Sequence, residues 1–356
     1  MGEATVIILH PGADGEGPLT RLLAEARDRL VAHQVRLFER AGVRVVRVER
    51  GAPESSFGEL LAALAGGVPG GLIILGAGAV PRLSPADARR LVAVAGGGGR
   101  RALTNNRYSS DVCAVSGAGA LRDLPPLRGD NALPRWLAER AGFAVAELAG
   151  RERLALDLDA PLDLALVALL PRPPAGLAPL ARERGLAVPR LAELRALAAD
   201  PRRELLVFGR ASSRTLAWLE RHVACRVRFL AEERGLRTAA PGQRPPRATL
   251  GRLLADRGPA ALADLVAELA DGAVLDSRVL LADRLGADER RWPAAEDRFA
   301  SDLLRASAVE DPWLRALTAS AAGAPIPILL GGHTLVGAGL PLLLRGGRST
   351  IHSCGA

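Results

Sequence analysis

Short apolar runs alternate with amphipathic stretches along the chain, and this pattern predicts alternating strands and helices. Residues 5–9 (TVIIL) are an apolar run typical of a buried strand, and from Pro18 the apolar side chains follow helical spacing until Gly42. Residues 43–48 predict a second strand. A strand, a helix and a second strand in this order favour a parallel sheet covered by helices.

The same alternation continues along the rest of the chain. It predicts strands over residues 71–75 and 154–158, and helices that begin near Ser84 and Pro161. In the second half it predicts four more short strands, over residues 204–208, 226–230, 273–275 and 326–330. We therefore expect an α/β fold throughout.

The length of 356 residues exceeds that of a usual single domain, so two domains are expected. Residues 171–174 (PRPP) are the clearest candidate linker. We predict a first domain over residues 1–170, built on a mostly parallel sheet flanked by helices, and a second, smaller α/β domain of unknown role over residues 175–356. Prolines interrupt the apolar segment 324–344, which favours a strand, a turn and a buried helix over a membrane span.

The charge of the chain limits the kinds of partner that we expect, and its cysteines indicate the cellular location. The formal net charge is +8, but all 47 basic residues are arginine and they are interspersed with acidic residues, without a basic block that carries aromatic side chains. We therefore expect neither nucleic acid nor a membrane as a partner. The three cysteines are far apart and the N-terminus lacks the basic region of a secretion signal, which favours a cytoplasmic location.

All asparagines lie between residues 105 and 131, two of them beside the only tyrosine, Tyr108. Asparagine builds turns through its side chain, and loop asparagines also contact ligands, so both roles are open. Amide, guanidinium and carboxylate groups here suit a base, a ribose and a phosphate. Asn105, Asn106 and Asp111 are therefore candidate nucleotide-binding residues, and Arg107 is a candidate catalytic residue.

A glycine-rich loop precedes the first predicted helix. Gly12, Gly15 and Gly17 place backbone N–H groups near a helix N-terminus, which suits a phosphate, although an ordinary tight turn is the alternative. This loop and the loops 76–81 and 104–111 each follow a predicted strand. Ligands of open parallel sheets bind at the carboxyl ends of the strands, so the three loops are expected to converge.

Two carboxylates share one face of the predicted strand 154–158 and the residue after it. Asp157 and Asp159 would repel each other unless a cation or hydrogen-bond donors lie between them, and Mg²⁺ bound with substrate phosphates is a suitable cation. The alternative is that Asp159 caps the helix that begins at Pro161 while Asp157 is solvated.

Two segments of the second half carry further candidates. Residues 331–334 (GGHT) follow a predicted strand, where His333 would serve as a base or help to bind an anion, or else be part of a structural turn. The charged segment 297–302 is expected to be a solvated or salt-bridged face.

These motifs carry a resemblance to a known family. Residues 156–164 (LDLDAPLDL) resemble the L-D-I-D-T-P-E-D-L ending of nucleotidyltransferases with the nucleotide-diphospho-sugar transferase fold, notably the molybdenum cofactor and phospholactate guanylyltransferases. Residues 81–87 (PRLSPAD) are similar to part of that family's D-x-P-L-L-T-P-x-D-L segment. The resemblance covers residues 4–168. It implies transfer of a nucleotidyl group from an NTP to a phosphorylated small molecule, with Mg²⁺ at Asp157 and Asp159 and with Arg107 or Arg21 near the phosphates.

The chain also departs from that family. It contains no lysine, and Ala79 stands where the family has a metal-binding aspartate. A catalytically inactive nucleotide-binding or scaffolding protein is therefore the alternative. A third hypothesis is a different transferase whose ligand contacts both the Asn105 loop and the His333 loop. The sequence does not indicate an oligomeric state.

Overall fold

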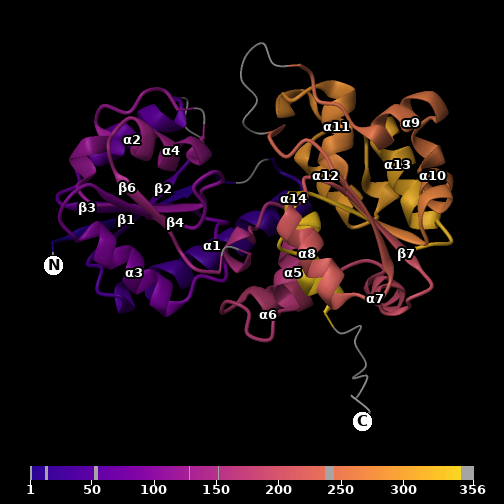
Figure 1. The fold of residues 1–356 in the computed structure, drawn as a ribbon, viewed down its shortest axis with the longest axis horizontal. Coiled ribbons are helices and arrows are strands. Elements are labelled where there is room, and N and C mark those ends of the chain that lie inside the picture. Colours follow the sequence, from indigo (N-terminus) through magenta and orange to yellow (C-terminus); the bar gives the residue numbers. More distant parts are fainter. Residues whose placement is uncertain are drawn as a thin grey trace, which may run out of the picture. The chain divides into compact units, whose positions relative to one another are not determined.

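The structure is a computed structural model, and it describes residues 2–12, 15–51, 55–127, 129–150, 152–236 and 244–345. The chain has an α/β fold with two compact units, each built around its own sheet (Figure 1). Unit 1 falls within residues 1–14, 23–158 and 172–177, and unit 2 falls within residues 15–22, 159–171 and 178–356.

The sheet of unit 1 has six strands in the order β2-β1-β3-β5-β4-β6. All neighbouring strands are parallel except those beside β5, which runs antiparallel to both β3 and β4. The sheet is thus largely parallel, as predicted, although the antiparallel strand was not expected. The strands are β1 (Ala4–His10), β2 (Val45–Arg50), β3 (Gly71–Gly76), β4 (Arg101–Thr104), β5 (Val112–Val115) and β6 (Ala144–Glu147).

Helices cover both faces of this sheet. Helices α1 (Pro18–Arg40) and α3 (Pro85–Ala95) lie on one face, and α2 (Phe57–Ala65) and α4 (Leu133–Glu139) lie on the other (Figure 1). Strand β1 shows how one strand serves both faces: Val6 and Ile8 pack with α1 and α3, whereas Ile7 packs with α2 and α4. Apolar residues in succession thus indicate a strand that is buried on both sides.

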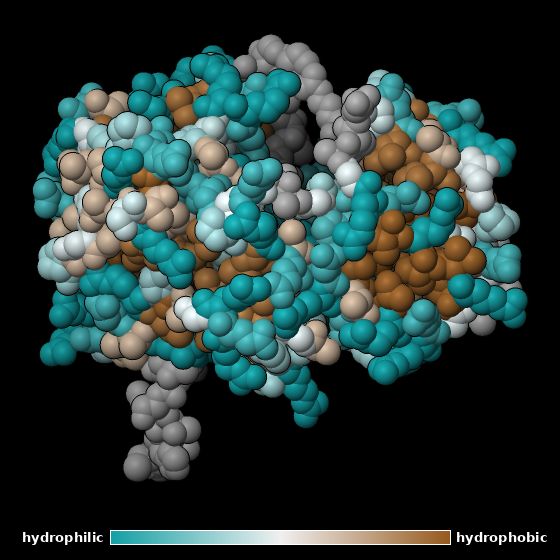
Figure 2. Space-filling view, turned by 180° about the vertical axis from the view of Figure 1, so that it is seen from behind, coloured by the Kyte–Doolittle hydropathy of each residue, from teal (hydrophilic) through white to brown (hydrophobic). Residues whose placement is uncertain are grey.

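Strand β2 forms one edge of the same sheet, because it pairs only with β1. Its Val45 is 47% exposed, and hydrophobic side chains gather on the surface of unit 1 in the space-filling view (Figure 2). The strand also carries three charged residues, Arg47, Glu49 and Arg50. Such charges oppose the pairing of an exposed edge with another chain.

The sheet of unit 2 has four parallel strands in the order β10-β9-β7-β8. They are β7 (Glu204–Gly209), β8 (Arg226–Ala231), β9 (Gly272–Asp276) and β10 (Ile328–Gly331), so each of the four strands predicted in the second half is present. The helices are α5 (Pro161–Ala168), α6 (Leu177–Glu183), α7 (Leu191–Ala199), α8 (Ser213–His222), α9 (Thr249–Arg257), α10 (Leu262–Leu269), α11 (Ser277–Leu285), α12 (Ala295–Asp302), α13 (Pro312–Gly323), α14 (His333–Val336) and α15 (Leu340–Leu344).

The predicted strand over residues 154–158 is wrong. The chain forms a short 3₁₀ helix over Arg153–Ala155 and then runs extended, outside both sheets. Leu154, Leu156 and Leu158 are fully buried. The alternating pattern therefore reflects the burial of every second side chain and not the pairing of a strand in a sheet. Their backbone groups bond to loops instead of to a neighbouring strand, as described below.

The apolar segment 324–344 contains β10 and the two short helices α14 and α15. Within the described ranges, every helix is too short or too polar to cross a membrane.

Candidate functional site

The three predicted loops follow strands of unit 1 that end at the same edge of its sheet. Strands β1, β3 and β4 all run in the same direction, and they end at His10, Gly76 and Thr104. The loops that follow therefore leave from the same edge. A direct contact joins two of these strand ends, because the N–H of Ala77 donates to the carbonyl of Leu9 at 2.8 Å.

The segment that ends at Leu158 crosses this edge. The carbonyl of Leu154 accepts a hydrogen bond from Nδ2 of Asn105 at 3.0 Å, and the N–H of Leu158 donates to Gly78 at 2.9 Å. Between them, Oδ1 of Asp157 accepts from the N–H of Val80 at 3.3 Å. The segment thus bridges two of the predicted loops and places Asp157 at the carboxyl ends of the strands.

The buried side chain of Asn105 holds its loop together through hydrogen bonds. Its side chain is fully buried, and Nδ2 donates to Oδ2 of Asp111 at 2.6 Å as well as to Leu154. Its Oδ1 accepts from the N–H groups of Asp111 and Val112, at 2.9 and 3.3 Å. The hydroxyl of Thr104 also donates to Oδ1, at 3.5 Å. Both N–H donors and the oxygen of this amide are therefore engaged inside the protein. These contacts support the turn-building role, and the nucleotide-binding role of Asn105 stays a prediction.

The neighbouring residues are less buried than Asn105. Oδ1 of Asn106 accepts from the N–H of Tyr108 at 3.0 Å, and Tyr108 is 63% exposed. The N–H of Arg107 donates to Glu147 at 2.7 Å. Within the described ranges, nothing accepts a hydrogen bond from the buried Nε of Arg107. The roles proposed for Asn106, Arg107 and Asp111 stay predictions.

The N-terminus of α1 already holds a carboxylate. Glu296 of α12 accepts from the N–H of Leu19 at 2.9 and 3.1 Å and from the N–H of Thr20 at 2.9 Å. Gly17 permits this approach, because a Cβ there would lie 2.1 Å from Oε2 of Glu296. These first-turn donors are the ones from which a phosphate would accept.

The other two glycines of that loop have left-handed backbone angles. Gly12 has a φ of 86° and Gly15 a φ of 127°, which favour glycine over residues with a side chain. The N–H of Gly12 donates to Nδ1 of the buried His10 at 3.0 Å. Turn geometry thus accounts for both glycines, and their binding of a phosphate stays a prediction.

In unit 2, Asp159 stands directly before the first turn of α5. The carboxylate that closes this turn belongs to Asp163, whose Oδ2 accepts from the N–H groups of Asp159 and Ala160 at 3.0 and 2.8 Å. Asp163 is 3% exposed. Burial, together with the negative charges of Asp159 and Asp302, raises the pKa of Asp163 well above its usual value. The backbone of Asp159 is thereby fixed, while its side chain remains half-exposed.

His333 begins α14, two residues after β10 ends. Gly331 leaves room for Leu335 of α14 and for Leu162 of α5, because a Cβ there would lie 2.6 Å from Cδ2 of Leu335 and 3.1 Å from Cδ2 of Leu162. Gly339 does the same one helical turn further along α5, where a Cβ would lie 2.8 Å from Cδ1 of Leu166. Residues on either side of His333 therefore pack against the helix that follows Asp159.

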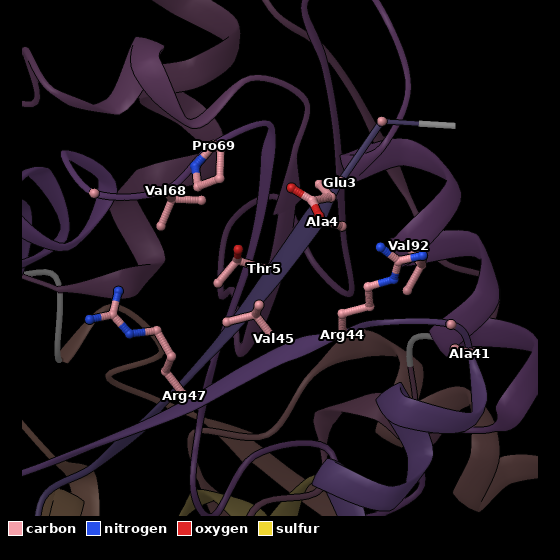
Figure 3. Close-up of a pocket in the computed structure, with 13 residues that line it drawn as sticks. Glu3, Ala4, Thr5, Ala41, Arg44, Val45, Arg47, Val68, Pro69 and Val92 are labelled. Atoms are coloured by element: carbon pink, nitrogen blue, oxygen red, sulfur yellow. The ribbon is translucent and has the colours of Figure 1, made fainter.

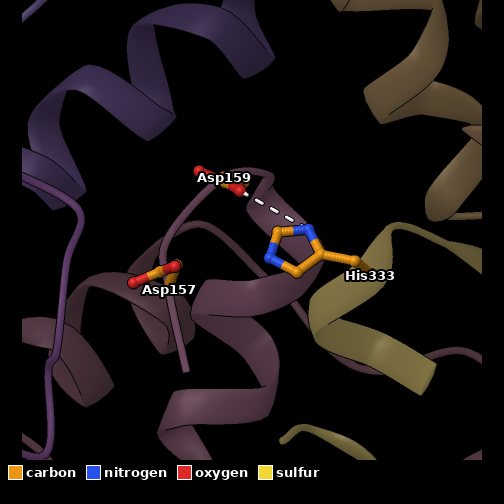
Figure 4. A group of neighbouring side chains, drawn as sticks. All are labelled: Asp157, Asp159 and His333. Atoms are coloured by element: carbon orange, nitrogen blue, oxygen red, sulfur yellow. Dashed lines mark ion pairs between the residues drawn. The ribbon is translucent and has the colours of Figure 1, made fainter. Parts of the chain in front are cut away.

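The result is a pair of opposite charges, formed when His333 is protonated. Nδ1 of His333 lies 3.8 Å from Oδ2 of Asp159, with the imidazole 32% and the carboxylate 45% exposed. Asp157 stands two residues before Asp159, and Figure 4 draws both carboxylates together with the imidazole of His333. The sequence predicted the two carboxylates, but it did not connect them with the imidazole.

Charged residues at the same end of the unit 2 sheet are buried in pairs. Arg278 of α11 binds Asp302 through both Nη atoms, and Arg210, next to the end of β7, binds Asp276 at the end of β9 at 2.6 and 3.1 Å. Both aspartates are fully buried. Of the two alternatives predicted for residues 297–302, the salt-bridged one holds for Asp302, but Asp302 and Asp297 are buried and not part of a solvated face.

Sequence reasoning did not single out these buried pairs. The strongest available signal was the position of Asp276 directly after a predicted strand, since carboxyl ends of strands carry polar groups of sites. Burial raises the pKa of Asp302, while the guanidinium of Arg278 acts in the opposite direction. Each of these aspartates is neutralised by its own arginine, so none of the four buried charges is left without a partner. The two ion pairs also hold the ends of the strands near His333 in place.

Neither described cysteine is suited to nucleophilic chemistry. Burial raises the pKa of the Cys113 thiol to about 12 and that of Cys225 to about 11. A thiol is reactive as the thiolate, which such pKa values suppress near neutral pH. Cys354 lies outside the described residues.

A cavity of about 500 Å³ lies elsewhere in unit 1, near the amino ends of β1 and β2 (Figure 3). Thr5, Val45 and Val68 line it together with Arg44 and Arg47. None of the predicted site residues lines it, because they follow the carboxyl ends of the strands. Ligands of open parallel sheets bind at that other edge.

Comparison with known proteins adds no assignment: neither a scan against models of protein families nor a search of curated proteins gives a match.

Proposed function

We propose that the chain is a nucleotidyltransferase-like protein that binds an NTP with a divalent cation and transfers the nucleotidyl group to a phosphorylated small-molecule acceptor. The observation that supports the proposal is the pair of carboxylates at Asp157 and Asp159, two residues apart at the end of a segment that resembles the family motif. The nucleotide-diphospho-sugar transferase fold of the first domain is part of this proposal.

The side chains of the candidate site match the ligand preferences of Mg²⁺ only in part. Carboxylate oxygens are ligands that Mg²⁺ takes in proteins, usually one or two of them together with substrate phosphates. The side chain of Asp159 is 45% exposed, so a ligand can reach it from solvent. The imidazole of His333 is the unusual member of the group, because Mg²⁺ prefers oxygen.

In the proposed reaction the protein mainly positions the reactants. Asp157 and Asp159 would hold the cation, which supplies positive charge to the phosphates of the NTP. Arg107 would place its guanidinium beside a phosphate, and its buried Nε is without an acceptor among the described residues. Holding the two phosphates in line lowers the entropic part of the barrier.

The chemical balance is that of a nucleotidyl transfer. A phosphate oxygen of the acceptor forms a bond to the α-phosphorus of the NTP. The bond from that phosphorus to the bridging oxygen of the β-phosphate breaks, and pyrophosphate leaves with the electron pair. An acceptor that is already ionised at its phosphate needs no protein base.

A specific observation favours the inactive alternative as the second candidate. The first-turn N–H groups of Leu19 and Thr20 are hydrogen-bonded to Glu296, so a phosphate would have to displace a carboxylate there. Ala79 replaces the second family aspartate, and its carbonyl accepts from Gln34 at 2.8 Å. A protein that binds a nucleotide without turning it over would retain Asp157 and Asp159 and tolerate both differences.

Turnover separates the two candidates. Each NTP is incubated with the full chain, Mg²⁺ and a set of phosphorylated small molecules, and the release of pyrophosphate is measured. The transferase proposal predicts release that depends on both the acceptor and the cation and that is lost in the variants Asp157→Ala and Asp159→Ala. An exposed aspartate of α10 provides the matched control, Asp264→Ala, which should retain activity. Release unchanged by both site variants would remove the assignment of these residues.

A further inference from the structure

We infer that the cavity near the amino ends of β1 and β2 is a second binding site, and that it takes a small monocarboxylate whose apolar body carries a hydroxyl group. All of the residues that line this cavity belong to unit 1, and none of them is a residue of the candidate nucleotidyl-transfer site. The inference therefore goes beyond the proposed function and does not depend on it.

The first argument is a buried hydroxyl group at the cavity. Thr5 is 5% exposed and lines the cavity from β1, where the next three residues are apolar (Figure 3). Among the described residues, none forms a hydrogen bond with this hydroxyl. Buried polar side chains in proteins are nearly always hydrogen-bonded. A hydroxyl group on a ligand would supply the missing partner, because it can both donate and accept.

The second argument is the apolar surface of the cavity. Val68 is buried in its wall, whereas Val45 of the edge strand β2 is 47% exposed. Val45 is one of only two large hydrophobic side chains that are exposed in the described part of the chain. Pro69 and Val92 add to the apolar lining. A ligand with an apolar body that packs against Val45 would remove this surface from water.

The charges of the lining favour a ligand with one negative charge. Arg44 is exposed, and no residue in the described ranges forms an ion pair or hydrogen bond with its side chain. Nε of Arg47 lies 3.6 Å from Oε1 of Glu49, so this second guanidinium is already partly neutralised. A guanidinium can bind a carboxylate through two parallel N–H bonds. Glu3 also lines the cavity, and its carboxylate would repel a doubly charged phosphate more strongly than a monocarboxylate.

Backbone contacts hold the floor of the cavity. Strand β1 lies between two parallel neighbours, and Thr5 stands opposite Val45 of β2 and Leu72 of β3. The carbonyl of Glu3 accepts a hydrogen bond from the N–H of Gly71 at 3.0 Å. The volume of about 500 Å³ falls within the range of small-molecule sites, roughly 300–1,000 Å³. The cavity is therefore preformed and large enough for such a ligand.

The test measures binding to the full chain by isothermal titration calorimetry. The probes are phenylacetate, 4-hydroxyphenylacetate, the neutral 4-hydroxyphenylacetamide and phenyl phosphate. The variants are Arg44→Ala, Thr5→Val and Val45→Glu, which adds a negative charge at an exposed position of the lining. Arg89→Ala is the control, since Arg89 is an exposed arginine of α3 outside the cavity. Circular dichroism checks that each variant is folded.

We expect both carboxylates to bind more tightly than the amide and the phosphate, with 4-hydroxyphenylacetate ahead of phenylacetate. Arg44→Ala should weaken the binding of both carboxylates on the order of 10-fold, because a hydrogen bond to a charged group is lost. Val45→Glu should weaken it at least as much, through repulsion and lost apolar contact. Thr5→Val should abolish the preference for the hydroxylated probe, and Arg89→Ala should change nothing.

Several results would overturn the inference. Neither carboxylate would bind at millimolar concentration, or both would bind equally well to the parent chain, Arg44→Ala and Val45→Glu. Tighter binding of phenyl phosphate or of the amide would refute a monocarboxylate ligand, and a preference for the hydroxylated probe that survives in Thr5→Val would refute the role of Thr5. None of these results bears on NTP turnover, so the inference and the proposed function stand or fall separately.

Discussion

Nδ1 of His333 lies 3.8 Å from Oδ2 of Asp159, although the two residues belong to segments far apart in the chain. One stands at the start of α14 behind a glycine pair, and the other precedes α5. Gly331 ends β10 two residues before His333, and a Cβ there would lie 2.6 Å from Leu335 of α14 and 3.1 Å from Leu162 of α5, so the absence of a side chain lets these segments approach one another. The candidate site is therefore a product of tertiary packing and not of the motif alone.

The carboxylate of Glu296 should stabilise the start of α1. It accepts from the N–H groups of Leu19 and Thr20, so Glu296→Ala leaves both donors without this partner. We expect a loss of about 1–2 kcal/mol in the free energy of unfolding, the usual range for a helix cap. Urea unfolding measures it, with Glu220→Ala on the exposed face of α8 as the control. A loss equal to that of the control would contradict the capping role.

Gly17 and Glu296 should be energetically coupled. In Gly17→Ala the new Cβ would lie 2.1 Å from Oε2 of Glu296, so the carboxylate must move away from its donors. The substitution should destabilise the parent chain, and it should cost clearly less in a chain that already carries Glu296→Ala. Urea unfolding of the four proteins gives the coupling energy. Additive effects would mean that Gly17 serves another purpose, such as the predicted phosphate contact.

Asn105 should matter for stability independently of any ligand. Its side chain makes five hydrogen bonds inside the protein, to Leu154, Asp111, Val112 and the hydroxyl of Thr104. Asn105→Ala should cost about 2–3 kcal/mol, because buried groups lose their partners. Asn106→Ala, in the more exposed part of the same loop, should cost less than about 1 kcal/mol. Similar values for both variants, measured by chemical denaturation, would argue against the turn-building role.

The capping box of α3 should contribute stability that depends on pH. Burial acts to raise the pKa of Asp87, but hydrogen bonds from Ser84 and Arg153 outweigh it, and the pKa lies below the usual value of 3.8. A depressed pKa in the folded state adds stability that is present above about pH 3.8 and is lost as the pH falls through the lowered pKa.

We therefore expect Asp87→Asn to lower the free energy of unfolding by about 1–2 kcal/mol at pH 7, because a charged hydrogen bond to Arg153 is lost. The difference from the parent chain should shrink at pH 3. Urea unfolding at the two pH values measures both, with Asp264→Asn as the control. A difference that stays constant or grows as the pH falls would show that the sign is wrong.

Local patterns predicted much of the fold. The structure contains the strand predicted over residues 5–9, the helix that begins after Ser84 and the four strands of the second half. These elements were predictable because the spacing of buried residues and the capping of a helix each depend on only a few neighbouring residues. The antiparallel β5 was missed, because four buried residues carry no mark of strand direction. The segment 154–158 was misassigned because its alternating leucines are buried while its backbone bonds to loops.

The candidate site was predictable only in part. The spacing of Asp157 and Asp159 indicated a pair of carboxylates, and the carboxylate of Asp159 lies beside the imidazole of His333. The imidazole of His333 and the carboxylate of Glu296 reach their partners through tertiary contacts that no local pattern encodes. The alternative of Asp159 as a helix cap gave way to Asp163, which stands in the first turn of α5 and closes it.

Nucleotide-dependent thermal stabilisation is the first measurement to make. The unfolding temperature of the full chain is recorded with each NTP alone, with Mg²⁺ and with Mn²⁺, and again for the double variant of Asp157→Ala and Asp159→Ala. A ligand at about a hundred times its Kd adds about 2.7 kcal/mol to the folded state. The proposed function predicts a rise that requires a divalent cation, is largest for one NTP and disappears in the double variant. The absence of any rise with either cation, or an equal rise in the double variant, would contradict it.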